Sequence, residues 1–172
     1  MEHVLIPPAK PTTPYYDCRF AVLREPIGFQ RGAELLDDDE QAIHAWVEYD
    51  DLVVAVGRAH LIGAESDGSA ADHAGPDATK CPGFGPLTDP SNRPAIQIRQ
   101  MGTRQEARRK GHAAIVLEAL EKNSKHHFGA KIGLLQAREI AIPFYQSQGW
   151  TLIDEPYSID GIGPHRSMMK QL

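Results

Sequence analysis

Strand and helix patterns alternate through the second half of the sequence, and this alternation restricts the fold more than any other feature. Ala95–Thr103 carries isoleucine at alternate positions, as a strand does. In Arg109–His127 apolar residues recur every three or four positions, which predicts the longest helix, ending near Gly129. The following patterns predict a strand, a short helix and two further strands: Lys131–Ala137, Glu139–Gln148, Trp150–Asp154 and Arg166–Leu172. This order predicts one mixed domain of α/β or α+β class.

The first half is richer in strand patterns. A helix is expected from Thr13 to about Pro26, and Ala42–Tyr49 with Leu52–Ile62 predicts a β-hairpin. The acidic stretch Asp37–Glu40 is expected to be a solvated turn, because it lacks the further oxygen ligands of a calcium loop. Gly63–Pro94 has almost no apolar periodicity, so it is interpreted as an insertion within a single domain of residues 1–172.

Composition narrows the classes of partner. The 172 residues carry a net charge of −5, and a binder of nucleic acid or of membrane surfaces would normally be basic. The longest apolar run, Leu52–Val56, is far too short to cross a membrane. Cys18 and Cys81 show neither metal-ligand spacing nor a disulfide framework, so we expect a reduced, cytoplasmic protein without a metal, with Cys18 in the core.

One segment is basic although the chain is acidic. Arg104–Lys110 holds four cations and one carboxylate, a net charge of +3, directly before the long predicted helix. Positive side chains are unfavourable at a helix N-terminus unless an anion binds there. With Gly111 and the small Ala113, the exposed backbone N–H groups could form a phosphate cradle. A solvated, basic helix start is the alternative, and the spacing fits neither a P-loop nor a dinucleotide-binding fingerprint.

Two motifs in this half resemble those of the GNAT superfamily of N-acetyltransferases. Arg108-x-x-Gly111-x-Ala113 resembles the family's Q/R-x-x-G-x-G/A pyrophosphate motif, and Ala137–Trp150 resembles its A-x-x-x-A-x-x-F-Y-x-x-x-G-F segment, with Trp150 replacing Phe. The C-terminal Tyr157–His165 is similar to the Y-x-x-D-G-I-P-H ending of the ElaA-like branch, with Gly163 inserted. The insertion at 63–94 departs from the family, which joins these strands briefly.

The resemblance implies a GNAT-like fold, in which a mainly antiparallel mixed sheet of about six to seven strands is flanked by helices. It also implies acetyl-CoA as the acyl donor and no metal. The thioester arm would lie along Met101, Gly102 and Thr103, with a backbone N–H near Met101 polarising the carbonyl. Further residues are implied at the pyrophosphate or elsewhere on the cofactor: Arg108, Arg109, Lys110, Gly111, His112, Ala113, Ala114 and Arg138.

The resemblance further implies that Tyr145 is the general acid, because the matching tyrosine in the family faces the thioester sulfur. The general base stays open. The strand that often supplies a carboxylate reads Ile96-Gln-Ile-Arg-Gln100 and has none. His165, which suits a base at neutral pH, is the first candidate; Glu25, His60 and a water chain are the others.

We therefore expect an acetyl-CoA-dependent N-acyltransferase that acts on the amine of a small molecule or peptide in a ternary complex. Arg24, Glu25 and Arg99 are the candidate acceptor-binding residues, since arginines could pair with a substrate carboxylate or phosphate; the acidic surface leaves a cationic acceptor open. Two alternatives remain, a catalytically silent acyl-CoA-binding regulator and an interaction module that uses only the fold. The insertion could cover the acceptor pocket or lie in a homodimer contact.

Overall fold

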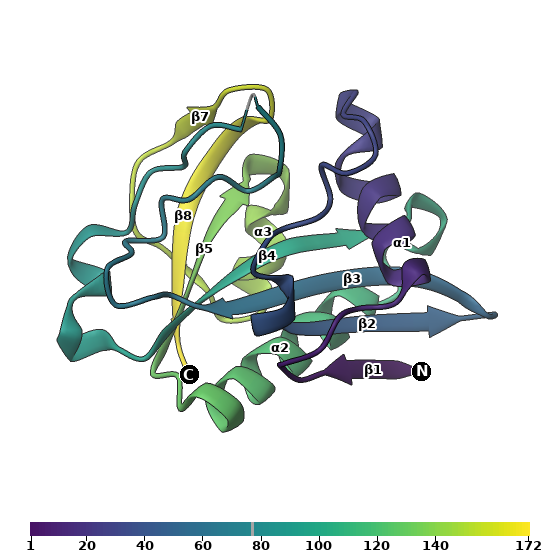
Figure 1. Cartoon of the computed structure of the whole chain (residues 1–172). Coiled ribbons are helices and arrows are strands. Elements are labelled where there is room, and N and C mark those ends of the chain that lie inside the picture. The colour runs from purple at the N-terminus through teal and green to yellow at the C-terminus, as the bar shows by residue number, and fades with distance from the viewer. Residues whose placement is uncertain (77) are drawn as a thin grey trace.

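The computed structural model describes residues 1–76 and 78–172, and it is built on one sheet. Eight strands pair in the order β1-β2-β3-β4-β5-β8-β6, with β7 paired to β8 (Figure 1). Only the contact between β4 and β5 is parallel; the other pairs are antiparallel. The strands are β1 (Glu2–Leu5), β2 (Ile43–Tyr49), β3 (Leu52–Leu61), β4 (Ala95–Thr103), β5 (Ile132–Arg138), β6 (Thr151–Leu152), β7 (Tyr157–Ile159) and β8 (Gly163–Gln171).

Three helices cover this sheet: α1 (Thr13–Leu23), α2 (His112–Phe128) and α3 (Ile142–Ser147). Short 3₁₀ turns lie at Glu25–Ile27, Asp39–Gln41, Gly85–Thr88, Pro90–Asn92, Gln105–Ala107 and Glu139–Ala141. The predicted mixed sheet with flanking helices is confirmed. The sheet has one strand more than the upper expected number, and β1 and β7 were not predicted because so few residues form each of them.

The predicted element boundaries need small corrections. The long helix begins at His112 rather than Arg109, because Arg109 and Gly111 adopt positive φ angles of 60° and 84° that no helix tolerates. It ends as predicted, with Gly129 in the left-handed region. The segment Glu139–Gln148 is a 3₁₀ turn followed by the short α3, and β6 keeps only Thr151–Leu152 of the predicted strand.

The two faces of the sheet are covered differently. On one face, α2 and α3 pack over a core that includes Ile96, Ile98, Leu120 and Trp150. On the other face lie α1 and the insertion (Figure 1). Cys18 of α1 is fully buried there beside Tyr15, as expected for a core residue. None of the described helices is long and apolar enough to cross a membrane.

The described part of the insertion folds back over β3, β4 and β5. Arg93 fixes its base by donating hydrogen bonds to the carbonyl oxygens of Ile62, Gly63, Ser66 and Thr88, at 2.7 to 2.9 Å. Phe84 packs into a cluster with Ile62, Ala95, Ile132 and Leu134. Side chains of the sheet satisfy backbone oxygens of the insertion, for example Gln97 and Gln136, which both donate to Gly68. The insertion is thus part of the packed structure.

Candidate active site

A gap in the middle of the sheet forms the site. The parallel strands β4 and β5 pair only from Ala95 to Gln97 and from Ile132 to Leu134, and beyond these residues they separate. β4 stays paired to β3 as far as Thr103, and β5 stays paired to β8 as far as Arg138. The facing edges of β4 and β5 therefore leave room for another extended chain. A cavity of about 90 Å³ lies at this point, with walls supplied from both faces of the sheet.

A β-bulge in β4 shapes one wall of the cavity. Between the pairs Arg58–Arg99 and Val56–Gly102, β3 contributes one residue and β4 contributes two, Gln100 and Met101. Gln100 has a positive φ of 58°. The extra residue places Arg99 and Gln100 on the same face, where both reach the insertion. Met101 turns to the other face, toward Gly57 and α2.

The start of α2 has the backbone features that a phosphate cradle would need. Gly111 precedes the helix with φ of 84°, and no side chain of the described residues caps the first turn, which also holds no acid. The N–H groups of His112, Ala113 and Ala114 therefore point out of the helix without intrahelical partners. Arg108, Arg109 and Lys110 are exposed beside them, and none forms an ion pair within the described chain. This arrangement suits a pyrophosphate.

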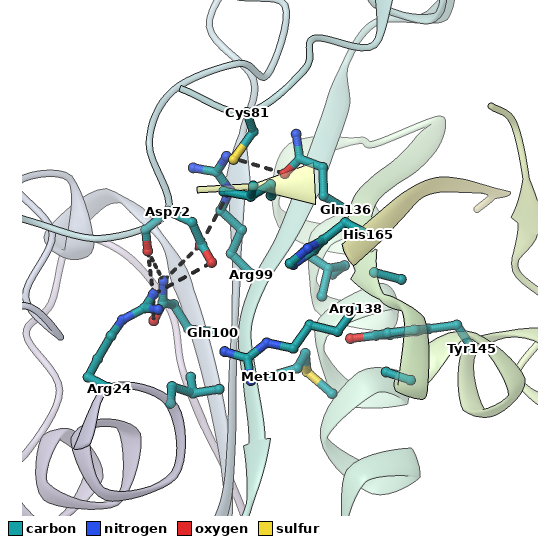
Figure 2. A pocket seen from close by; sticks show the side chains of 15 residues that line it. Arg24, Asp72, Cys81, Arg99, Gln100, Met101, Gln136, Arg138, Tyr145 and His165 are labelled. Carbon is teal, nitrogen blue, oxygen red and sulfur yellow. Dashed lines mark hydrogen bonds and ion pairs between the residues drawn. The ribbon is translucent and has the colours of Figure 1, made fainter. Parts of the chain in front are cut away.

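Tyr145 of α3 reaches the cavity from the face that α2 covers. Its ring packs against Phe144 and Trp150, with centroid distances of 5.1 and 6.2 Å, so its position is fixed. Among the described residues its hydroxyl has no hydrogen-bond partner, and it lines the cavity opposite β4 (Figure 2). Burial raises the pKa of Tyr145, which keeps the phenol protonated. The side chain can therefore donate a proton.

His165 lies across the β5–β8 pair from Arg138 and also lines the cavity. Its Nδ1 is 2.8 Å from the carbonyl oxygen of Gly163. Because a carbonyl only accepts, Nδ1 carries the hydrogen and Nε2 keeps its lone pair. Burial, with the nearby charge of Arg138, lowers the pKa of His165, so the ring is neutral at physiological pH. The side chain can therefore accept a proton.

Asp72 of the insertion enters the cavity from the other face. Its carboxylate oxygens lie 3.5 Å from Nη2 of Arg24 and 3.6 Å from Nε of Arg99. Shorter hydrogen bonds also hold Asp72. Gln100 donates from Nε2 to the backbone oxygen of Asp72 at 2.6 Å and to Oδ1 at 2.9 Å, and Nη2 of Arg24 donates to the same backbone oxygen at 2.5 Å. Although burial opposes ionisation, Arg99 and Arg24 lower the pKa of Asp72. It is therefore a carboxylate at neutral pH.

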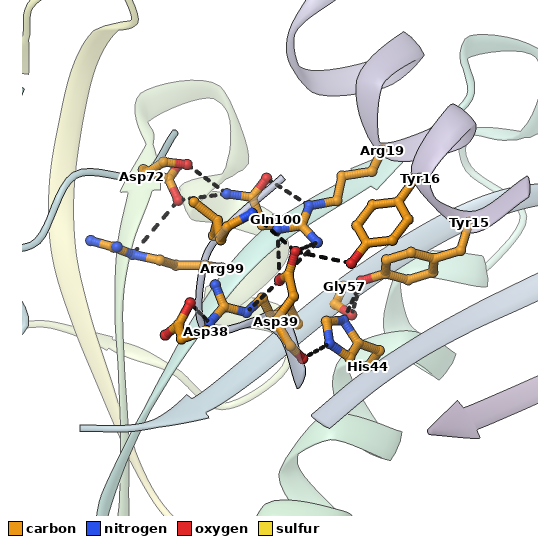
Figure 3. Close-up of polar contacts among 12 residues, drawn as sticks. Tyr15, Tyr16, Arg19, Asp38, Asp39, His44, Gly57, Asp72, Arg99 and Gln100 are labelled. Atoms are coloured by element: carbon orange, nitrogen blue, oxygen red, sulfur yellow. Dashed lines mark hydrogen bonds and ion pairs between the residues drawn. The ribbon is translucent and has the colours of Figure 1, made fainter. Parts of the chain in front are cut away.

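A buried polar network behind the bulge holds Gln100 in place (Figure 3). Arg19 donates to Oε1 of Gln100 at 3.1 Å and to the carboxylate of Asp39. Arg58 also pairs with Asp39, at 3.2 Å. The expectation of a solvated turn at Asp37–Glu40 is thus wrong for Asp39, which is 4% exposed because two buried arginines neutralise it. The network connects α1 and β3 to the wall of the cavity.

The structure brings six of the suggested site residues together around one cavity. Arg24, Arg99, Met101, Arg138, Tyr145 and His165 all line the cavity. Glu25 is exposed in the turn after α1 and is not part of the lining, and His60 of β3 is not part of it either. No sequence feature pointed to Asp72, which is one acid among several in an aperiodic segment. No group of three or more potential metal ligands occurs in residues 1–76 and 78–172.

Comparison with known proteins agrees with this architecture. The Acetyltransferase (GNAT) domain profile matches residues 77–172. A proposed N-acetyltransferase from Lactobacillus plantarum is 21% identical, with a TM-score of 0.68 over 99% of this chain and 98% of that chain. ElaA from Escherichia coli is 19% identical, with a TM-score of 0.64 over 99% of this chain and 100% of its own.

A GNAT acetyltransferase from Elizabethkingia anophelis, whose structure contains acetyl-CoA, is 12% identical, with a TM-score of 0.59 over 100% of this chain and 97% of that chain. No curated protein sequence matches the chain. The structural likenesses, all at low identity, show a shared fold. The domain profile covers more than half of the sequence, including α2, β5, α3 and the C-terminal strands. The chain belongs to the GNAT acetyltransferase family.

Proposed function

We propose that this protein is an acetyl-CoA-dependent N-acyltransferase that moves an acetyl group to the primary amine of a small molecule or peptide. The observation that carries the proposal is the pair of proton-transfer groups, Nε2 of His165 and the hydroxyl of Tyr145, on the walls of one gap between β4 and β5. Family membership and the cradle at the start of α2 support the choice of an acyl-CoA donor.

The residues that would hold acetyl-CoA fit that molecule. Its pyrophosphate would accept hydrogen bonds from the backbone between Arg109 and Ala114, with added attraction from Arg108 and Lys110. Its extended arm would lie along Met101–Thr103, in the gap that β5 leaves open. A backbone N–H near Met101 would stabilise the negative charge that develops on the carbonyl oxygen. When bound, acetyl-CoA supplies an activated acyl group.

His165 would act as the general base. The acceptor amine loses a proton to Nε2 while its nitrogen bonds to the thioester carbon within a ternary complex. The hydrogen bond from Nδ1 to Gly163 fixes the tautomer that this step requires. Because the pKa of His165 is lowered, the ring is already unprotonated when the amine arrives.

Tyr145 would act as the general acid. As the carbon–sulfur bond breaks, the departing thiolate takes the phenolic proton, and His165 holds the proton removed from the amine. The packing of Tyr145 between Phe144 and Trp150 orients the hydroxyl into the cavity. Proton exchange with solvent restores both groups after the products leave.

Calorimetry with CoA and a thiol-release assay with a panel of amines would test the proposal. Binding together with release of CoA in the presence of an amine would support the transferase. Binding without release for any amine would instead support the silent acyl-CoA-binding regulator. Absence of binding would overturn both and leave the interaction module.

A further inference from the structure

The cavity carries more positive than negative charge. Its lining includes three guanidinium groups, those of Arg24, Arg99 and Arg138, but the only lining carboxylate among the described residues is Asp72. His165 is neutral, so the lining has a formal surplus of two positive charges. Unpaired charge is costly in a buried place, and a bound anion would remove that cost.

Asp72 compensates its arginines only partly. Its ion-pair distances of 3.5 Å to Arg24 and 3.6 Å to Arg99 exceed those of close hydrogen bonds. Arg24 is 1% exposed. Its Nη2 donates to the backbone oxygen of Asp72 and to Oε1 of Gln100, but its Nε has no hydrogen-bond partner among the described residues. Burial lowers the pKa of Arg24, and Asp72 does not fully offset this effect. Arg24 can therefore accommodate a second anion.

Arg138 supplies the other side of the anion site. Its side chain extends from the end of β5 across the cavity toward the wall formed by Met101 and Arg24 (Figure 2). In the part of the chain that the structure describes, its guanidinium forms no hydrogen bond or ion pair. The charge of Arg138 further disfavours the protonated form of Arg24. Two cations that approach each other in this way create a place for an anion between them.

We propose that the acceptor is a small amine that carries its own carboxylate, bound by Arg24 and Arg138, with its nitrogen at Nε2 of His165. This inference rests on the proposed transferase function and names its substrate class. We choose a carboxylate because one carboxylate, that of Asp72, already lies beside Arg24 and Arg99 in this cavity. A polyamine is disfavoured because its positive charges would be repelled by the three arginines.

Matched acceptors test this proposal. Thiol release is measured for α-amino acids, for β-alanine and γ-aminobutyrate, and for the carboxamide of each. We expect kcat/KM to be at least tenfold higher for the acids. The amine of an α-amino acid carboxamide loses its proton more easily, so such a preference would come from binding and not from reactivity. Equal or faster reaction of the carboxamides would overturn the substrate class while leaving the transferase intact, and so would a preference for phosphoethanolamine.

Arg138→Gln provides the matched variant, because Arg138 is only partly buried and has no partner to lose in the described chain. We expect kcat/KM for the preferred amino acid to fall at least tenfold more than kcat/KM for its carboxamide. Arg31→Gln, which changes an exposed arginine that does not line this cavity, is the control. If Arg138→Gln instead raises the KM for acetyl-CoA and leaves the acid unaffected, Arg138 serves the donor and the proposal is wrong.

A binding measurement separates failure of this proposal from failure of the transferase. Calorimetry compares N-acetylglycine with N-acetylglycinamide on the protein saturated with CoA, and needs no turnover. At least tenfold tighter binding of the carboxylate, lost in Arg138→Gln, would support the proposal. Equal binding of the two would overturn it, whereas failure of CoA itself to bind would overturn the proposed function.

Discussion

Oδ1 of Asp72 lies 3.6 Å from Nε of Arg99, and this ion pair joins the insertion to the bulged strand at the centre of the site. Arg99 also donates to the backbone oxygens of Ala70 and Ala71. The insertion therefore forms one wall of the cavity. In this protein, the geometry of the acceptor side depends on how firmly that segment is anchored.

Removing the anchor at the base of the insertion should loosen this wall. Arg93 satisfies four carbonyl oxygens, so Arg93→Ala should lower the free energy of unfolding by about 2 kcal/mol and expose the insertion to proteases. Thermal unfolding and limited proteolysis would measure the two effects. Arg31→Ala, whose ion pairs lie outside the insertion, is the control. Unchanged protease resistance in Arg93→Ala would contradict the anchoring role.

A negative charge at the start of α2 should abolish tight CoA binding. Gly111→Glu places a carboxylate beside the proposed pyrophosphate, and no atom lies within 4 Å of the new Cβ. Gly129→Glu is a matched control at the other end of α2, with the same added charge, a similar positive φ of 66° and equal space. We expect at least a tenfold loss of CoA affinity, by calorimetry, for Gly111→Glu alone. Equal affinities in the two variants would place the phosphates elsewhere.

The features predicted from the sequence are local ones. The period of α2 and the glycines at its two ends depend on neighbouring residues, so the helix could be located. The position of Tyr145 beside a cofactor site was implied by the family resemblance, and Tyr145 lines the cavity. The strands β1 and β7 are too short to show a period and are defined by their partners β2 and β8.

Contacts between distant segments could not be predicted. Asp39 resembles its exposed acidic neighbours in sequence. It differs from Asp38, which also pairs with Arg58, in meeting the buried Arg19 as well. Asp72 belongs to the aperiodic insertion, and its neighbouring residues in the sequence do not distinguish it from Asp67. One signal was present. The alternation of β4 breaks at the consecutive polar residues Arg99 and Gln100, which is the position of the bulge.

Removing the phenolic hydroxyl should slow the chemical step. Tyr145→Phe keeps the packing against Trp150. It breaks no hydrogen bond in the described structure, because the hydroxyl has no partner there. We expect kcat to fall at least tenfold with an unchanged KM for acetyl-CoA, because the thiolate would leave without its proton donor. Thiol-release kinetics measure both constants. An unchanged kcat would show that Tyr145 only packs.

Protonation of His165 should define the acid side of the rate profile. Since burial lowers its pKa, the fall in kcat/KM that accompanies protonation of Nε2 should occur at a lower pH than for an ordinary histidine. His165→Ala should reduce the rate and remove this acid limb of the pH–rate profile. His126→Ala, at the exposed end of α2, should leave the profile unchanged. A limb that persists in His165→Ala would assign the base to another group.

The buried network should make the fold sensitive to acid through His44. This ring is fully buried, with Nε2 2.7 Å from the backbone oxygen of Asp39 and Nδ1 3.0 Å from the hydroxyl of Tyr15. Burial lowers the pKa of His44 to about 4, from 6.5. Above pH 6.5 neither state binds this proton. Between pH 6.5 and about 4 the unfolded chain binds it and the folded protein does not, so stability falls as the pH falls.

The expected slope from this one group approaches about 1.4 kcal/mol per pH unit. His44→Gln cannot titrate, and its amide can still donate to Asp39. It should therefore be less stable at pH 7 but lose less stability between pH 6.5 and pH 4, as measured by urea unfolding at each pH. His126→Gln, which changes an exposed histidine, should keep the wild-type slope. Only a group whose proton affinity differs between the folded and unfolded states can couple stability to pH. Equal slopes in His44→Gln and the wild type would therefore mean that His44 is protonated within the folded network.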